Sequence, residues 1–378
     1  SFLSLLMMRA VARMRHREVF ATIGGILIFV LVFFGQTMLS SRLSSSNSAE
    51  LVKAMTARGG LVTQASRIYP PSEWLTFALS GNSAPKYFLY LLGLSAAAVY
   101  IVIALSSRIY QKGMQVQFES PKGGSRKKYR FSSSSPVITI VKNEWISIIK
   151  TPVYAMNTLL GIILAPLVLI MPAFSGGSDT SSMIRLLHLN VGSFVMILIF
   201  AGVMSFFGLI NPAAATAISR EGKCLWLMKT IPLPPRTQLL GKFWSGYSIS
   251  ALIVLATAVS LAAVYRLSLA VVLVASLLAL ALLLTTTAFS LMVDVIRPKL
   301  TWSNQTEAIK QNMNSLFAML IGFLVVVFFV AVSIALLLLN LPAAVSVIIL
   351  LALLSGAAIG TTEWMFWLFD RKFYNMSI

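Results

Sequence analysis

The stretch "ISREGKCLWLMKTIPLPPRTQLLGK", residues 218–242, places charged residues and prolines between two long apolar segments. Of the 378 residues in the chain, 58% are hydrophobic and only 11% are charged. Soluble domains carry roughly 25% charged residues. A chain this apolar is typical of an all-α polytopic membrane protein, because a helix satisfies its own backbone hydrogen bonds in lipid. The quoted stretch is then a polar connection outside the bilayer.

Eight apolar stretches are long enough to cross the hydrocarbon core, which takes roughly 20 helical residues. They cover residues 19–39, 86–107, 153–174, 188–210, 243–265, 267–291, 315–339 and 341–362. The outer connections near 266 and 340 are nearly absent, so the last two pairs of adjoining helices are expected to form tight hairpins.

The distribution of Lys and Arg predicts the orientation. With a cytoplasmic N-terminus, 23 of the 30 Lys and Arg fall on the cytoplasmic side and 7 on the outside. This asymmetry favours cytoplasmic N- and C-termini. The basic cluster "SRKKYR" at 125–130 fits anionic lipid headgroups better than nucleic acid, which we do not expect as a partner.

Residues 137–150, "VITIVKNEWISIIK", predict an amphipathic helix along the cytoplasmic surface. Ser135 and Pro136 suit the N-cap and the first helical position. The residues expected at the membrane interface are Lys142, Glu144, Trp145 and Lys150.

The long outer loop, residues 40–85, contains "YPPSEWLTFALSG" at 69–81. Pro71 can start a short helix there, and Trp74 and Phe77 suit the membrane interface. The alternative is an ordinary disordered loop.

Residue types that carry chemistry are scarce. The middles of the eight stretches hold no ionisable residue, which argues against a proton- or ion-coupled transporter. One Cys and two His offer no metal-ligand cluster, so we expect no metal site. "REGKC" lacks the first Gly and the Ser or Thr of a phosphate-binding loop, so we expect no catalytic residue and no bound cofactor in this chain.

Residues 211–242 connect two expected spans on the cytoplasmic side. Asn211 and Pro212 predict the start of a helix, and 213–217 should continue it toward Gly222 or Thr230. Its apolar residues, Leu225, Trp226, Leu227 and Met228, would face water unless something covers them. Two interpretations stay open at this point: a docking surface for a soluble partner, or a second helix lying on lipid.

The same segment resembles the coupling-helix region of type-2 ABC exporter permeases. In that family an acidic residue and Gly precede a hydrophobic run, then a Pro, then Gly-Lys at the next span. The matching residues here are Glu221, Gly222, Leu225, Pro232, Gly241 and Lys242. The stretches "KNEWISIIKTPVY" (142–154) and "DVIRPKLTWSNQTEAIKQNMN" (294–314) resemble a subgroup of the same permeases.

The resemblance implies a domain organisation. Residues 137–378 would form a complete six-span permease half, with the surface helix at 137–150 and the coupling segment at 211–242. Residues 1–136 would supply the last two spans of a preceding half, so we expect further spans upstream in the native chain.

The resemblance also implies a function: the permease subunit of an ABC exporter in a bacterial cytoplasmic membrane. Two copies of a separate ATPase subunit would bind ATP and Mg and move an apolar or amphipathic substrate. Membrane lipids, and a second permease copy or an upstream half, would be further partners. The implied docking residues are Glu221, Gly222, Lys223, Trp226, Lys229, Pro232 and Arg236, with Arg297 and Lys299 as a second contact. The alternative is a non-transporting scaffold or sensor subunit that docks a cytoplasmic partner.

Overall fold

The computed structural model describes residues 24–36, 70–80, 84–118, 135–174 and 192–375. The chain divides into two compact units, residues 1–21 with 34–131, and residues 22–33 with 132–378. The basic cluster at 125–130 and residues 40–69 of the outer loop lie outside the described residues.

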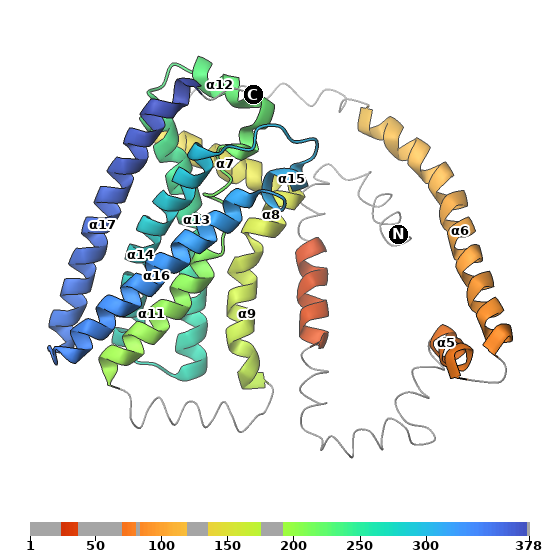
Figure 1. Ribbon diagram of the computed structural model, residues 1–378, viewed down its shortest axis with the longest axis horizontal. Helices are drawn as coiled ribbons and strands as arrows, with labels where there is room; N and C mark the ends of the chain where they lie inside the picture. The colour runs from red at the N-terminus through yellow and green to blue at the C-terminus, as the bar shows by residue number, and fades with distance from the viewer. Residues whose placement is uncertain (1–23, 37–69, 81–83, 119–134, 175–191, 376–378) are drawn as a thin grey trace, which may run out of the picture. The chain divides into compact units, whose positions relative to one another are not determined.

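The first unit contains α5 (Pro70–Ser80) and α6 (Ala84–Phe118) (Figure 1). The two helices pack through aromatic pairs: the ring centroids of Trp74 and Tyr90 are 5.6 Å apart, and those of Phe77 and Tyr87 are 5.1 Å apart. The short helix predicted within 69–81 is therefore confirmed.

The second unit is a helical bundle. In chain order it contains α7 (Pro136–Lys150), α8 (Pro152–Thr158), α9 (Leu160–Phe174), α11 (Ser193–Leu209), η1 (Ser219–Cys224), α12 (Leu225–Thr230), α13 (Pro235–Tyr265), α14 (Leu269–Ile296), α15 (Gln305–Ile309), α16 (Met313–Leu338), α17 (Ala343–Lys372) and η2 (Phe373–Asn375). Within the bundle, α14 contacts α11, α13, α16 and α17. Figure 1 shows α7, α8, α12 and α15 at one end of the bundle, which we call the polar end.

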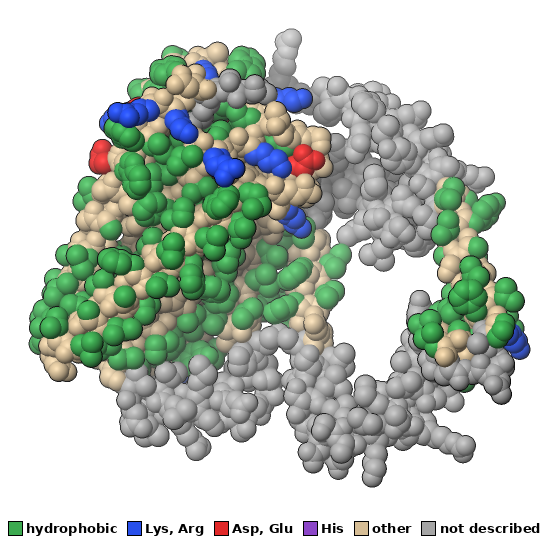
Figure 2. Space-filling view, in the orientation of Figure 1, with side chains coloured by type: hydrophobic (Ala, Val, Ile, Leu, Met, Phe, Trp, Pro, Cys, Tyr) green, Lys and Arg blue, Asp and Glu red, His purple; other side chains and the backbone are tan. Residues whose placement is uncertain are grey.

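In the part of the chain that the structure describes, five helices are long and apolar enough to span a membrane. Three shorter apolar helices, Gly24–Gln36, Pro85–Ile101 and Ser193–Leu209, coincide with the other expected spans. Figure 2 shows hydrophobic side chains along the length of the bundle and Lys and Arg gathered toward the polar end. The expectation of an all-α polytopic membrane protein is confirmed.

The boundaries of some spans differ from the prediction. The stretch 153–174 is divided at Leu159 into α8 and α9, and α17 continues to Lys372. α13 begins at Pro235 rather than near 243, because Pro at the first helical position has a fixed φ suited to a helix. The predicted hairpins at 266 and 340 are present, and Arg266 and Asn340 end their helices in the left-handed conformation.

The helix expected from Pro212 through residue 217 is wrong: residues 212–218 form turns. The Asn211 side chain accepts a hydrogen bond from Ala213 N at 3.0 Å, which closes a turn. The carbonyls of Ala213 and Ala217 accept hydrogen bonds from the side chains of Arg220 and Lys242. Backbone groups that would continue a helix are thus bound by side chains instead.

Close contact between α13 and these turns depends on Gly246. A Cβ at this position would lie 2.8 Å from Ala214 Cβ and 3.1 Å from Ala214 Cα. Because Cα belongs to the backbone, a rotamer change cannot relieve the overlap. Gly356, in α17, has no atom within 4 Å of its virtual Cβ.

We expect Gly246→Ala to destabilise the protein by about 1–2 kcal/mol through overpacking. Gly356→Ala, the matched control, should leave stability unchanged or raise it, because Ala favours helix over Gly. Thermal unfolding of both variants in detergent checks this difference. Equal melting temperatures would show that the approach of α13 to Ala214 is not tight.

Candidate functional site

The polar segment, residues 211–242, runs from the end of α11 into the first turns of α13. It covers the polar end of the bundle together with α7, α8 and α15 (Figure 1). Two sets of side chains, most of them buried, fix it to the neighbouring helices.

The first set is an ion cluster made of Glu144, Arg220, Glu221 and Lys242. Lys242 Nζ lies 2.5 Å from a carboxylate oxygen of Glu144 and 2.5 Å from one of Glu221. Arg220 Nη2 lies 2.8 Å from the other oxygen of Glu144. The Lys242 side chain is 3% exposed and the Arg220 side chain 5%. Two acids and two bases balance each other, so the cluster joins α7, the polar segment and α13 without needing another counter-ion.

Two opposing effects act on the Glu144 carboxyl. Burial raises its pKa, but the Lys242 ammonium and the Arg220 guanidinium outweigh burial and hold the pKa at about 2, below the usual 4.5. Glu144 is therefore ionised at neutral pH. Removing one partner of a buried ion pair leaves the other charge uncompensated, which typically costs about 3–5 kcal/mol.

The second set centres on Asp294, which lies near the end of α14 and is fully buried. Its carboxylate accepts hydrogen bonds from Ile218 N at 2.6 Å, Ser219 N at 2.9 Å, Ser219 Oγ and Asn314 Nδ2 at 2.9 Å. We call this arrangement the Asp294 clamp. It ties the polar segment to α14 and to the first turn of α16.

Gly222 lies at the bend between the clamp and α12. Its φ is +52°, a conformation that L side chains rarely adopt. A Cβ would also lie 2.7 Å from the ring of Trp302, whose Nε1 donates to Ser219 O at 2.9 Å. Because Gly222 has no side chain, the chain can bend here in direct contact with the Trp302 ring.

Beyond this bend, α12 has a buried side and an exposed side. Leu225 and Met228 are buried in a hydrophobic cluster with residues of α13, α14 and α17. Trp226 is 58% exposed, and Leu227 and Ile231 are 43% and 45% exposed. The bundle thus covers two of the four apolar residues that were expected to face water.

The basic residues around α12 are placed differently from one another. Lys223 and Lys229 are exposed, and Lys229 donates to Tyr374 O at 3.1 Å. Arg236 forms an exposed ion pair with Asp370 at 2.7 Å, and Pro232 is exposed on the return toward α13.

Arg297 and Lys299, the residues predicted as a second contact with the ATPase, directly follow α14. The Arg297 guanidinium lies 5.6 Å from the centroid of the Phe317 ring. Lys299 N donates to Ser219 Oγ at 2.9 Å, and its Nζ donates to Gln311 O at 3.1 Å.

α7 is held more firmly than a helix that only lies on lipid. Trp145 Nε1 donates to Ser248 Oγ at 2.9 Å, and Ile148 is fully buried. Glu144 belongs to the ion cluster, whereas Lys142 and Lys150 are exposed. A Cβ at Gly241 would lie 2.6 Å from Ile140, so α7 crosses α13 at the glycine of the Gly-Lys pair.

Arg220 and Asp294 were not among the residues predicted for the site. A signal for Asp294 was present, because it is a single acid between Val293 and Val295 beside an expected span. The sequence identified Lys242 only through the motif. A single lysine at the start of an apolar stretch needs an acidic partner if it is buried.

A family model described as "Membrane protein of 12 TMs" matches residues 1–359. No curated protein and no solved structure matches the chain.

The ion cluster predicts a specific pH dependence. Because the pKa of Glu144 is lower in the folded protein, its ionised form stabilises the fold above about pH 4.5, and this contribution is lost as pH falls toward 2. We expect Glu144→Gln to lower the free energy of unfolding by about 3 kcal/mol at pH 7. The deficit relative to wild type should shrink by more than half at pH 3, as followed by denaturant unfolding in detergent.

The control for this experiment is Glu363→Gln, which removes an exposed carboxyl from α17. It should unfold like the wild type at both pH values. A deficit of Glu144→Gln that is the same at pH 7 and pH 3 would contradict the role given to its charge.

Proposed function

The chain belongs to a family of membrane proteins with twelve transmembrane segments, and from this premise we propose that it is the transmembrane permease subunit of an ABC exporter. Twelve segments are the number that two six-span halves contain. The resemblance of the polar segment and of residues 142–154 and 294–314 to such permeases supports the more specific assignment.

One observation carries the proposal: α12 exposes Trp226 on one side, while its other side is buried in the bundle. Large aromatic side chains are the residues that most often anchor a protein interface. Exposed Lys223 and Lys229 flank Trp226 and would favour an acidic rim on the partner. In this proposal the partner is an ABC ATPase, present in two copies, that holds the ATP and Mg.

The fixed attachment of the polar segment supports a role in transmitting force. The ion cluster connects it to α7 and α13, and the Asp294 clamp connects it to α14 and α16. Movement of α12, driven by dimerisation of the ATPases on ATP, would therefore be passed to several helices together. A segment attached only by its two ends would bend instead.

The character of the spans supports an apolar or amphipathic substrate. The middle stretches of α9, α11, α13, α14, α16 and α17 carry no charged residue. A strongly charged substrate would find no counter-charge there. The assignment further implies a bacterial cytoplasmic membrane with both termini in the cytoplasm, a lipid environment, and a second permease half from another copy or from the same polypeptide.

We expect Trp226→Ala to weaken binding of the ATPase more than tenfold, because the loss of a buried anchor costs on the order of 2 kcal/mol. The protein is purified from native membranes in mild detergent. Mass spectrometry then identifies a co-purifying subunit with a P-loop, and ATP hydrolysis is measured in the same sample.

Trp364→Ala is the matched control, because Trp364 is 54% exposed on α17 and its ring contacts Phe289 of α14, with the ring centroids 6.2 Å apart. It should retain full binding and hydrolysis. If Trp226→Ala also retains both, the docking assignment is wrong. A partner that depends on Trp226 but hydrolyses no ATP would favour the scaffold or sensor alternative.

A further inference from the structure

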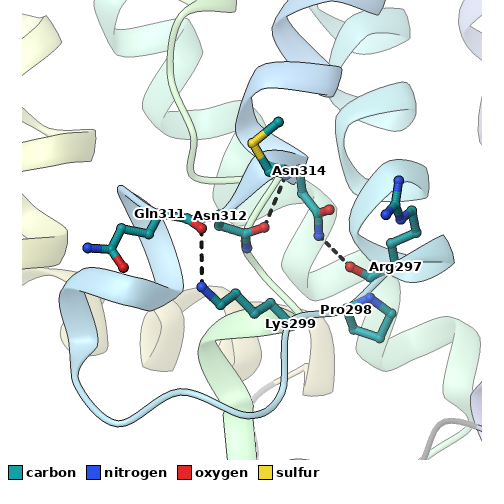
Figure 3. A pocket seen from close by; sticks show the side chains of 7 residues that line it. Arg297, Pro298, Lys299, Gln311, Asn312 and Asn314 are labelled. Atoms are coloured by element: carbon teal, nitrogen blue, oxygen red, sulfur yellow. Dashed lines mark hydrogen bonds between the residues drawn. The ribbon is translucent and has the colours of Figure 1, made fainter.

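A pocket of about 520 Å³ lies at the polar end of the bundle (Figure 3). Its wall comes from residues 297–299, which follow α14, and residues 311–314, which lead into α16. The pocket therefore joins a polar connection to the first turn of a membrane-spanning helix.

Two cations line this pocket, Arg297 and Lys299. Figure 3 shows them on opposite sides of the Asn314 side chain. Neither forms a salt bridge with any residue that the structure describes. Of the two nearby acids, Asp294 is occupied by its four donors. Glu307 accepts hydrogen bonds from Ser303 and interacts with Lys299 through charge alone, without a salt bridge.

Other charged groups near the pocket add to its positive character. Lys310 is exposed next to the pocket wall, and Lys372 Nζ donates to Ile296 O at 3.2 Å, beside Arg297. The four cations outnumber Asp294 and Glu307, so the region favours an anion.

Arg297 has the chemistry for such a ligand. Its guanidinium carbon lies 5.6 Å from the centroid of the Phe317 ring, so the group is held beside an aromatic side chain without forming a salt bridge. The N–H donors point outward in the plane of a guanidinium, where they can bind two oxygens of one phosphate. The positive end of the α16 helix dipole also lies at the pocket. No acidic residue in the first turn of α16 offsets it.

Apolar residues continue outward from the rim of the pocket along α16. Met313 is 58% exposed, Leu316 is 48%, and Leu320 and Phe323 are each 52% exposed. These residues recur at helical spacing, so they form one strip on the outer face of the helix. A ligand with a phosphate at one end and hydrocarbon chains at the other fits this combination.

We propose that Arg297 and Lys299 hold the headgroup of an anionic phospholipid from its two sides, with Arg297 on the phosphate, and that the acyl chains lie along the α16 strip in the leaflet at the polar end. This site is separate from α12 and does not depend on whether an ATPase binds there. It assigns these two residues to the membrane rather than to a second contact with the ATPase.

The test uses native mass spectrometry of the whole chain in detergent, titrated with phosphatidylglycerol, phosphatidylcholine or glycerol 3-phosphate. Wild type should retain phosphatidylglycerol in preference to phosphatidylcholine. Arg297→Gln and Lys299→Gln should each weaken phosphatidylglycerol binding by about tenfold, in keeping with the loss of a charge-assisted hydrogen bond. Because neither side chain is buried, both variants are expected to fold, and thermal unfolding verifies this.

Lys142→Gln is the control, because it removes an exposed lysine from α7. It should bind phosphatidylglycerol as wild type does. Equal weakening in Lys142→Gln would overturn the proposal, because the effect would then be one of general charge. Equal binding of glycerol 3-phosphate and phosphatidylglycerol would also overturn it, since the acyl chains would then contribute nothing.

Discussion

Lys242 lies at the junction of three parts of the bundle, with one ammonium group between the carboxylates of α7 and the polar segment. A lysine buried this deeply is tolerated only when its charge is compensated. Glu144 and Glu221 both supply this compensation, and α7 crosses α13 at Gly241, the residue before Lys242. Arg220 completes the balance, because Glu144 has a second oxygen to satisfy.

The Asp294 clamp and the bend at Gly222 extend this arrangement toward α12. The clamp fixes the backbone at Ile218 and Ser219, and Trp302 then leaves room only for a glycine three residues further on. The direction of α12 follows from these contacts. Its buried side meets the hydrophobic cluster, and Trp226 is left on the surface.

Hydropathy was sufficient to find the spans, because a lipid environment demands an apolar run of a certain length wherever the chain crosses it. The short helix at 70–80 could also be predicted, since Pro71 and the aromatic residues are local signals. The turns at 212–218 could not. Helix propensity is local, whereas the side chain that captures Ala217 O belongs to Lys242, 25 residues further along. For the same reason the motif identified Gly222 and Glu221 but gave no partner for either of them.

The separation of these partners along the chain has a consequence for biogenesis. The ion cluster joins residues 76 and 98 positions apart, and all of its members have been synthesised once the first eight residues of α13 are complete. Asp294 follows 75 residues after Ser219, and Asn314 comes later still. The polar segment can therefore pair with α7 and α13 before the Asp294 clamp, which needs α14 and the start of α16, is available. The order of synthesis thus allows the ion cluster to form before the Asp294 clamp.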